Sequence, residues 1–130
     1  MSKYTPYHAA SAKYAIDLCR GAKTPKERYD RITAWVSRSI GYDYIRATKI
    51  AKLKGQAPDI YGCWSKRMGI CMDISALTVN MLKAVGIRAF VCIGHADGNY
   101  HAWVEAIIGN QRYRYDHSGK AKVYRTERAY

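Results

Sequence analysis

The sequence lacks a long apolar segment, and no stretch approaches the roughly 20 apolar residues that a membrane helix needs. Residues 1–10 contain no apolar centre and no small-residue cleavage pattern, so no signal peptide is predicted and the compartment stays open. Internal repeats, low-complexity stretches and linkers are also missing. We therefore predict a single domain over residues 1–130, a length that suffices for one hydrophobic core.

Cysteine pairs with zinc-ligand spacing are absent as well. The four cysteines are Cys19, Cys63, Cys71 and Cys92, and no two of them form a CxxC pair. The gap between Cys63 and Cys71 fits no common zinc site. Because 48% of the residues are hydrophobic, the chain does not need a disulfide framework. We expect reduced thiols and predict no metal site.

Acidic residues are scarce, with 10 Asp and Glu against 22 Lys and Arg, which gives a formal charge of +12. Such a charge favours an anionic partner, whether a nucleic acid, an acidic polymer, an anionic membrane surface or an acidic protein. A modest basic cluster comprises Arg46, Lys49, Lys52 and Lys54, and a solvated basic face is the simplest interpretation of it. No basic–aromatic motif of the nucleic-acid-binding kind is present, so nucleic acid is disfavoured as a partner without being ruled out.

The first half of the chain is predicted to be mostly helical. Residues 7–20 are rich in alanine, and residues 24–27 combine a capping box with proline at the first helical position. Apolar residues three or four apart then extend this second helix to about Gly41. A short third helix is predicted over residues 45–54, and residues 59–69 are predicted to be a loop.

The second half changes from a helical pattern to alternating strand patterns. Residues 71–85 have helical spacing and precede Gly86, a residue that often ends helices. Strands are predicted over residues 87–93, 100–108, 111–115 and 122–125, with Gly109-Asn110 as a two-residue hairpin turn. Helices first and antiparallel strands last predict an α+β domain in which one helix packs on the sheet.

Cys71 occupies the predicted start of a helix. Unpaired backbone N–H groups and the positive end of the helix dipole stabilise a thiolate there, and Lys66 and Arg67 act in the same direction. The alternative is that Cys71 is a small buried hydrophobic residue, as most free cysteines are.

His101 and Asp116 lie on the two strands of the predicted hairpin. If the turn uses only Gly109 and Asn110, Asp116 lies opposite Trp103, and His101 points to the same face as Trp103. His101 and Asp116 are then diagonal neighbours within reach of each other, whereas a register shift of one residue would separate them.

A cysteine at a helix start and a histidine oriented by a carboxylate are the components of a thiol acyl-transfer site. The backbone N–H of Cys71 would be one oxyanion donor. The other histidines, His8, His95 and His117, are interpreted as surface or structural residues, His95 within a turn-like segment.

Four segments in this order resemble the transglutaminase-like superfamily. They are Gly-Ile-Cys-Met-Asp-Ile-Ser-Ala-Leu (69–77), Ala-Val-Gly-Ile-Arg-Ala (84–89), His-Ala-Trp-Val-Glu (101–105) and Tyr-Arg-Tyr-Asp (113–116). Upstream, Ser-Ile-Gly-Tyr-Asp-Tyr (39–44) is similar to the segment that often follows the entry helix of the family. The resemblance implies a papain-like α+β fold, with N-terminal helices and the nucleophile helix packed on an antiparallel sheet.

The resemblance also implies the catalytic residues: Cys71 as nucleophile, His101 as base and Asp116 as the orienting acid. The chain departs from the family pattern at Asp116-His117, where Asp-Pro is usual. The second oxyanion donor of the family has no certain counterpart, and Tyr42 and Trp64 are candidates. Trp103 is interpreted either as a wall of the site or as core packing.

The resemblance implies a thiol enzyme that acts on peptide or protein amide bonds through a thioester and needs no cofactor. Members include cysteine peptidases, amidases and protein-glutamine transglutaminases. The alternative is a non-catalytic binding module on the same scaffold, which would hold an anionic partner through its basic surface.

Overall fold

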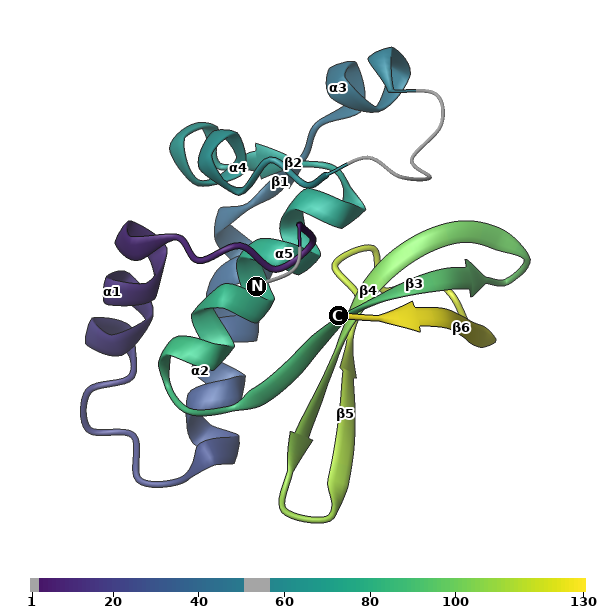
Figure 1. The fold of residues 1–130 in the computed structure, drawn as a ribbon. Helices are drawn as coiled ribbons and strands as arrows, with labels where there is room; N and C mark the ends of the chain where they lie inside the picture. Colours follow the sequence, from purple (N-terminus) through teal and green to yellow (C-terminus); the bar gives the residue numbers. More distant parts are fainter. Residues whose placement is uncertain (1–2, 51–56) are drawn as a thin grey trace.

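The computed structural model describes residues 3–50 and 57–130. Its helices are α1 (Ala9–Leu18), α2 (Pro25–Ser39), α3 (Tyr44–Lys49), α4 (Ile60–Lys66) and α5 (Cys71–Ala84). Its strands are β1 (Gly41–Tyr42), β2 (Met68–Gly69), β3 (Arg88–Ala96), β4 (Asn99–Ile108), β5 (Gln111–Tyr115) and β6 (Tyr124–Ala129). The helices lie to one side of the larger sheet, and α5 packs directly on β3 and β4 (Figure 1). This α+β architecture is the one predicted.

The larger sheet has the strand order β5-β4-β3-β6 and is antiparallel throughout. The β4–β5 hairpin closes through Gly109 and Asn110, and Ile108 pairs with Gln111. The predicted register is therefore confirmed. The short strands β1 and β2 form a separate parallel pair that the sequence did not predict, because two residues carry no alternating pattern.

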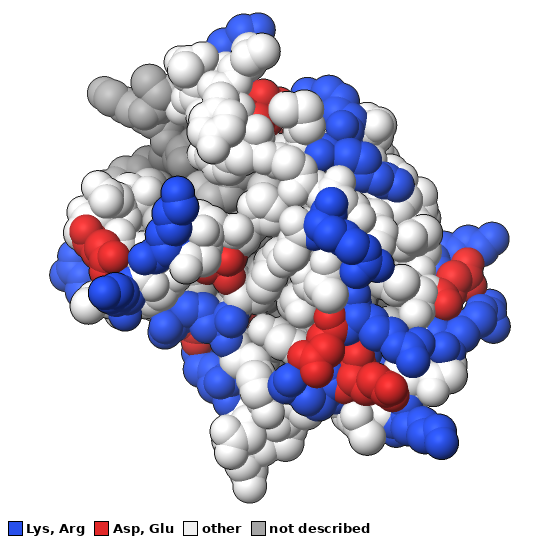
Figure 2. All heavy atoms as spheres, turned by 180° about the vertical axis from the view of Figure 1, so that it is seen from behind, with Lys and Arg blue, Asp and Glu red and all other residues white. Residues whose placement is uncertain are grey.

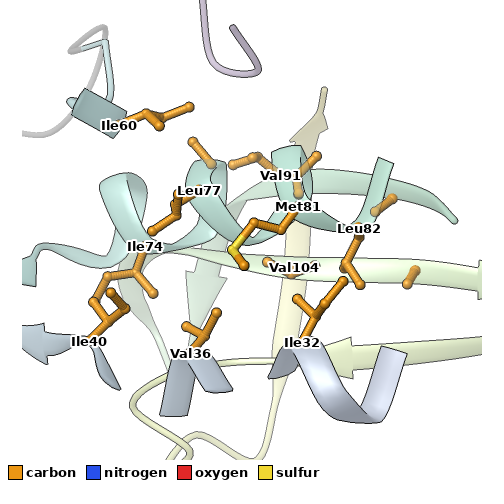
Figure 3. Packing of buried hydrophobic residues seen from close by; sticks show 14 of the residues in the cluster. Ile32, Val36, Ile40, Ile60, Ile74, Leu77, Met81, Leu82, Val91 and Val104 are labelled. Carbon is orange, nitrogen blue, oxygen red and sulfur yellow. The ribbon is translucent and has the colours of Figure 1, made fainter. Parts of the chain in front are cut away.

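Helix α5 forms the centre of the core, and every residue from Cys71 to Leu82 is buried. Figure 3 shows Ile74, Leu77 and Met81 of α5 between the apolar side chains of α2 and those of the sheet. Full burial of one such aliphatic side chain stabilises the fold by about 1.5–3 kcal/mol. The start of α5 is thus fixed by the best-packed element of the protein.

The predicted capping box of α2 is present in one half, because the Glu27 carboxylate accepts from the N–H of Lys23 and not from that of Thr24. Pro25 is the first helical residue, and the hydroxyl of Thr24 accepts a hydrogen bond from the backbone N–H of Glu27 at 3.1 Å. This bond satisfies one of the free N–H groups at the helix start.

The predicted loop over residues 59–69 is wrong, because most of it forms α4 and β2. Asp59 caps α4 by accepting from the N–H of Gly62 at 2.9 Å, and Ile60 and Cys63 are buried. A seven-residue helix is too short to show a clear apolar period, so tertiary burial decided its structure.

Two other predictions need correction at their ends. His95 lies within β3 and not in a turn, which is formed instead by Asp97 and Gly98. The third helix starts at Tyr44 and ends at Lys49, and residues 51–54 of the prediction lie outside the described residues.

Lys and Arg side chains are spread over the face shown in Figure 2, and several acidic side chains lie beside them. The face shown therefore carries its basic charge in dispersed form. Over residues 3–50 and 57–130, no helix combines the length and apolar character that a membrane crossing requires. Within the same described ranges, no three His, Cys, Asp or Glu side chains gather as a metal site would need.

Candidate active site

Cys71 is the first residue of α5, and its side chain is 8% exposed. The helix start is capped by a residue of its own first turn. The Asp73 carboxylate accepts a hydrogen bond from the backbone N–H of Ile70 at 3.0 Å. The sulfur therefore lies at the positive end of a helix of 14 residues.

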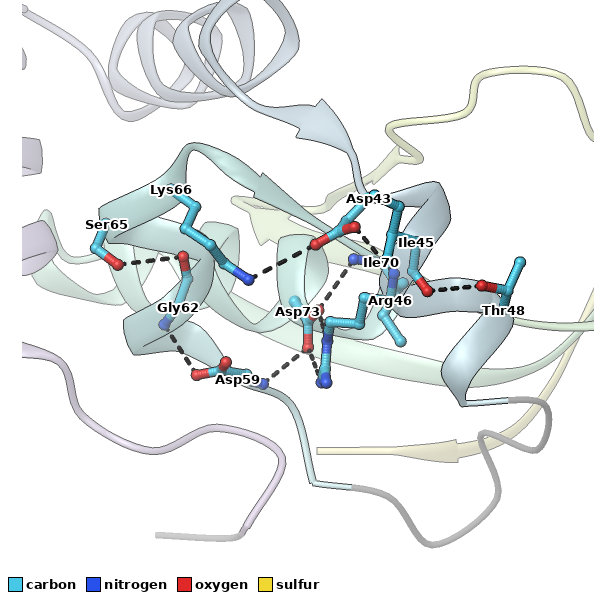
Figure 4. Close-up of polar contacts among 10 residues, drawn as sticks. All are labelled: Asp43, Ile45, Arg46, Thr48, Asp59, Gly62, Ser65, Lys66, Ile70 and Asp73. Carbon is cyan, nitrogen blue, oxygen red and sulfur yellow. Dashed lines mark hydrogen bonds and ion pairs between the residues drawn. The ribbon is translucent and has the colours of Figure 1, made fainter.

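Asp73 also connects this helix start to two other segments (Figure 4). Its carboxylate accepts hydrogen bonds from Nε and Nη2 of Arg46, at 2.8 and 3.0 Å. It also accepts one from the backbone N–H of Asp59, at 2.8 Å. Arg46 is therefore held in an ion pair, in contrast to its predicted place on a solvated basic face. The network fixes α3 and the start of α4 against the segment that carries Cys71.

His101 and Asp116 form a hydrogen-bonded ion pair on the hairpin, as the register predicts. Nε2 of His101 lies 3.0 Å from each oxygen of the Asp116 carboxylate. Burial alone would lower the pKa of His101, but hydrogen bonds to Asp116 and Cys71 outweigh it and raise the pKa to about 10. The pair thus favours a protonated imidazole.

The Asp116 carboxylate has further donors that the sequence did not indicate. The N–H and hydroxyl of Ser118 lie 3.1 and 2.9 Å from Oδ1, and the hydroxyl of Tyr124 lies 2.7 Å from Oδ2. Burial would raise the pKa of Asp116, but the hydrogen bonds from His101, Tyr124 and Ser118 lower it to about 2. Asp116 is therefore ionised at neutral pH.

Cys71 and His101 meet at one small cavity of about 20 Å³, room for about one water molecule. Its wall comprises Tyr42, Cys71, Ile74, Ser75, His101, Ala102, Asp116, His117 and Ser118. The Cys71 thiol is a hydrogen-bonding neighbour of His101. Because Asp116 holds Nε2, the other ring nitrogen, Nδ1, is left for the sulfur.

His101 and Ser118 also border a second, larger hollow of about 220 Å³. Its remaining lining residues are Ala96, Asp97, Asn99, Lys120 and Ala121. Cys71 is not among the lining residues of this hollow, so it is separate from the cavity at the sulfur.

The three aromatic candidates have different positions. Tyr42 lines the cavity at Cys71. Trp64 packs in a cluster with Tyr14 and Trp35 and is not among the residues lining the cavity. Its position there gives no support to a role as oxyanion donor.

Trp103 is fully buried and stacks against the His101 ring, with 6.2 Å between the ring centroids. Its indole N–H donates to Glu105 at 3.0 Å. The indole therefore packs against His101 and lines neither of the two hollows that His101 borders. Of its two predicted interpretations, core packing describes it better.

His117 joins the site although the sequence suggested only a surface or structural role. It lines the cavity, and its Nε2 donates to the carbonyl of Ile40 at 2.7 Å. This bond ties the segment after Asp116 to the end of α2. No sequence signal beyond adjacency to Asp116 identified His117, and none identified Ser118 or Tyr124.

Burial raises the pKa of the other three thiols. The pKa of Cys63 rises to about 12 and that of Cys92 to about 11, and the pKa of Cys19 is also raised. All three are thus poor nucleophiles near neutral pH. Among the described cysteines, only Cys71 has an imidazole beside it.

Comparison with solved structures shows the same fold. The chain aligns with a proposed cysteine protease from Cytophaga hutchinsonii at a TM-score of 0.69 and 19% identity, over 92% of this chain and 41% of that one. It aligns with a TGase at a TM-score of 0.65 and 16% identity, over 92% and 34% of the two chains.

A proposed protease from Parabacteroides distasonis aligns at a TM-score of 0.57 and 17% identity, over 82% of this chain and 22% of that one. The chain thus spans less than half the length of each of these proteins. A search of curated proteins found no match.

The sequence itself supplies the family assignment. Residues 12–117 match the family model of the transglutaminase-like superfamily, which is most of the chain. The fold agrees with this match, as do the solved structures similar to it. The chain belongs to the transglutaminase-like superfamily.

Proposed function

We propose that this protein is a thiol acyl-transfer enzyme that acts on amide bonds in peptides or proteins. The observation that carries the proposal is the orientation of His101, whose Nε2 is held by Asp116 while the thiol of Cys71 lies beside the same ring. In this arrangement Nδ1 of His101 accepts the thiol proton, and the Asp116 carboxylate stabilises the imidazolium that forms.

The thiolate of Cys71 then attacks the substrate carbonyl carbon and forms a C–S bond. The carbonyl oxygen gains negative charge, which the backbone N–H of Cys71 and the hydroxyl of Tyr42 stabilise. The imidazolium of His101 returns its proton to the leaving amine, the C–N bond breaks, and a thioester remains.

The second half of the reaction releases the acyl group. Water or a second amine attacks the thioester carbon and gives a proton to His101, the C–S bond breaks, and the thiolate is restored. The leaving or arriving group must lie beside Nδ1 of His101 to exchange a proton with it, on the side of the ring where Cys71 lies. With water the enzyme is a peptidase or amidase, and with a lysine amine it is a protein-glutamine transglutaminase.

We favour hydrolysis, because the cavity at which Cys71 and His101 meet has room for about one water molecule. The solved proteins of this fold are described as proteases and as a TGase, which is consistent with either outcome.

Incubation with casein and a fluorescent primary amine tests the proposal, because cleavage and amine incorporation are both read in one reaction. The wild-type chain should show one of the two, and Cys71→Ser should show neither. Cys19→Ser, which alters another buried thiol, is the matched control and should retain turnover. Full turnover by Cys71→Ser would refute the role of Cys71.

Alkylation separates the enzyme from a binding module that only uses the basic surface. Iodoacetamide at mildly acidic pH should modify Cys71 well before Cys63 and Cys92, whose pKa values burial raises to about 12 and about 11. Equal, slow modification of all the cysteines, read by peptide mass spectrometry, would favour the binding module. This test needs no knowledge of the natural substrate.

A further inference from the structure

We propose that Tyr124 of β6 is a positioning residue, which holds the Asp116 carboxylate in the orientation that His101 requires. The proposal rests on the proposed function. Tyr124 acts through Asp116 and does not touch the reacting atoms. It lies beyond residue 117, where the match to the family model ends.

The hydrogen bonds at Asp116 are the first observation. The hydroxyl of Tyr124 donates to Oδ2 at 2.7 Å, the shortest bond that this carboxylate receives. Ser118 donates to the opposite oxygen, Oδ1, and Nε2 of His101 lies 3.0 Å from both oxygens. A carboxylate bound by His101 alone could rotate about its Cβ–Cγ bond, whereas donors on both oxygens fix its plane.

The Tyr124 ring is itself held in place. It makes an edge contact with Trp103, with 4.8 Å between the ring centroids, and the guanidinium of Arg114 lies 4.0 Å from its centroid. Trp103 also stacks against His101, so one indole supports both the histidine and the tyrosine. The hydroxyl is thus oriented before substrate binds, which is the condition for a positioning role.

The path of β6 depends on a glycine opposite His101. Gly94 pairs with His101 on one side and with Thr126 on the other. A Cβ at position 94 would lie 2.1 Å from the carbonyl oxygen of Arg125, the neighbour of Tyr124. The absence of a side chain at Gly94 lets β6 approach closely enough for Tyr124 to reach Asp116.

Tyr124→Phe removes only the hydroxyl and keeps the ring contacts. Tyr115→Phe is the matched control, because it removes a hydroxyl that bonds to Ser37, 2.8 Å away, outside the cavity. An NMR titration of the His101 imidazole is the first readout. Without the Tyr124 donor both the orientation and the charge of the carboxylate beside Nε2 change, so the pKa of His101 should shift from about 10, whereas Tyr115→Phe should leave it unchanged. An unchanged pKa in Tyr124→Phe would overturn the proposal.

Turnover of p-nitrophenyl acetate is the second readout. Tyr124→Phe should lower kcat about tenfold with KM little changed, as expected for loss of one hydrogen bond to a charged group. In an Asp116→Asn background the same substitution should have little further effect, because Tyr124 acts through Asp116. Equal losses in both backgrounds would contradict the positioning role.

The two readouts distinguish the two proposals. If the NMR shift is present but Cys71 is inert to iodoacetamide, the proposed function fails while the positioning of Asp116 stands. If Cys71 is reactive and essential but Tyr124→Phe leaves both the pKa of His101 and kcat unchanged, only the positioning role fails. Should Tyr124→Phe not fold, Ser118→Ala removes the hydroxyl donor from the other oxygen of Asp116 and should also shift the pKa of His101.

Discussion

Arg46 and Asp73 form a two-point ion pair at the start of the nucleophile helix, with Nε to Oδ2 at 2.8 Å and Nη2 to Oδ1 at 3.0 Å. The Asp73 side chain is 1% exposed, and the same Oδ2 accepts from the N–H of Ile70, the residue before Cys71. The guanidinium of α3 therefore neutralises a buried charge that also fixes the backbone at the candidate nucleophile.

Arg46→Met should destabilise the fold, because it leaves the Asp73 carboxylate buried with only two backbone N–H donors, those of Asp59 and Ile70. We expect a loss of about 1–3 kcal/mol in the free energy of unfolding, measured by urea titration. Lys49→Met, an exposed cation on the same helix, is the control and should change it by less than about 0.5 kcal/mol. Similar losses in the two variants would mean that the ion pair with Asp73 contributes little to the free energy of unfolding.

Asp116→Asn should keep the fold and weaken the enzyme. The amide carries one acceptor oxygen, for which Ser118, Tyr124 and His101 would compete, so the imidazole can take the wrong tautomer. We expect kcat for p-nitrophenyl acetate to fall by at least about tenfold. A variant as fast as the parent would remove Asp116 from the mechanism.

Stability should depend on pH through the His101–Asp116 pair. Folding raises the pKa of His101 from 6.5 to about 10, so its contribution is complete below pH 6.5 and is lost as the pH rises through 10. Folding lowers the pKa of Asp116 from 3.8 to about 2, so its contribution is present above 3.8 and is lost as the pH falls through 2. The pair should stabilise the protein most between about pH 4 and 6.5.

His101→Gln provides the measurement. The difference in unfolding free energy between the wild type and this variant should be larger at about pH 5.5 than at about pH 9, in urea titrations at constant ionic strength. A difference that grows toward pH 9 would have the opposite sign and would contradict a raised pKa of His101.

Gly94→Ala should disturb β6 and, through it, the active site. Its new methyl group would lie 2.1 Å from a backbone oxygen of Arg125, so the strand must shift. We expect a loss of about 1–3 kcal/mol in stability together with lower turnover. In Gly41→Ala, the control, the methyl group would meet its nearest atoms at 3.9 and 4.0 Å, an ordinary contact, and should cost little.

The sequence predicted those parts of the site that lie in a helix or strand with a regular spacing of apolar residues. The two-residue turn and the alternation of β4 and β5 determine that His101 and Asp116 share a face, and the observed pairing of Val104 with Tyr115 agrees with that register. The helix start at Cys71 could also be predicted, because apolar residues at helical spacing follow it over several turns.

The remaining partners could not be predicted, because tertiary contacts alone bring them to the site. Ser118 lies in the irregular segment after β5, and Tyr124 reaches Asp116 only because β6 pairs with β3. Arg46 lies 27 residues from Asp73, in a basic cluster that gives no hint of a buried acid. The helix α4 was missed for the same reason, since burial of Ile60 and Cys63 supports it.

The burial of α5 from Cys71 to Leu82 has a consequence for how this protein can change in evolution. The sulfur is anchored to the buried helix, whereas Tyr42, His117 and Ser118, which line the same cavity, come from the two-residue strand β1 and the segment after β5. Under the proposed function Tyr42 and Ser118 take part in the chemistry, so His117 is the position of the three where a substitution can reshape the cavity and leave the reactive groups in place. Under the proposed function, substrate preference can therefore change at His117 while Cys71 and its helix are inherited intact.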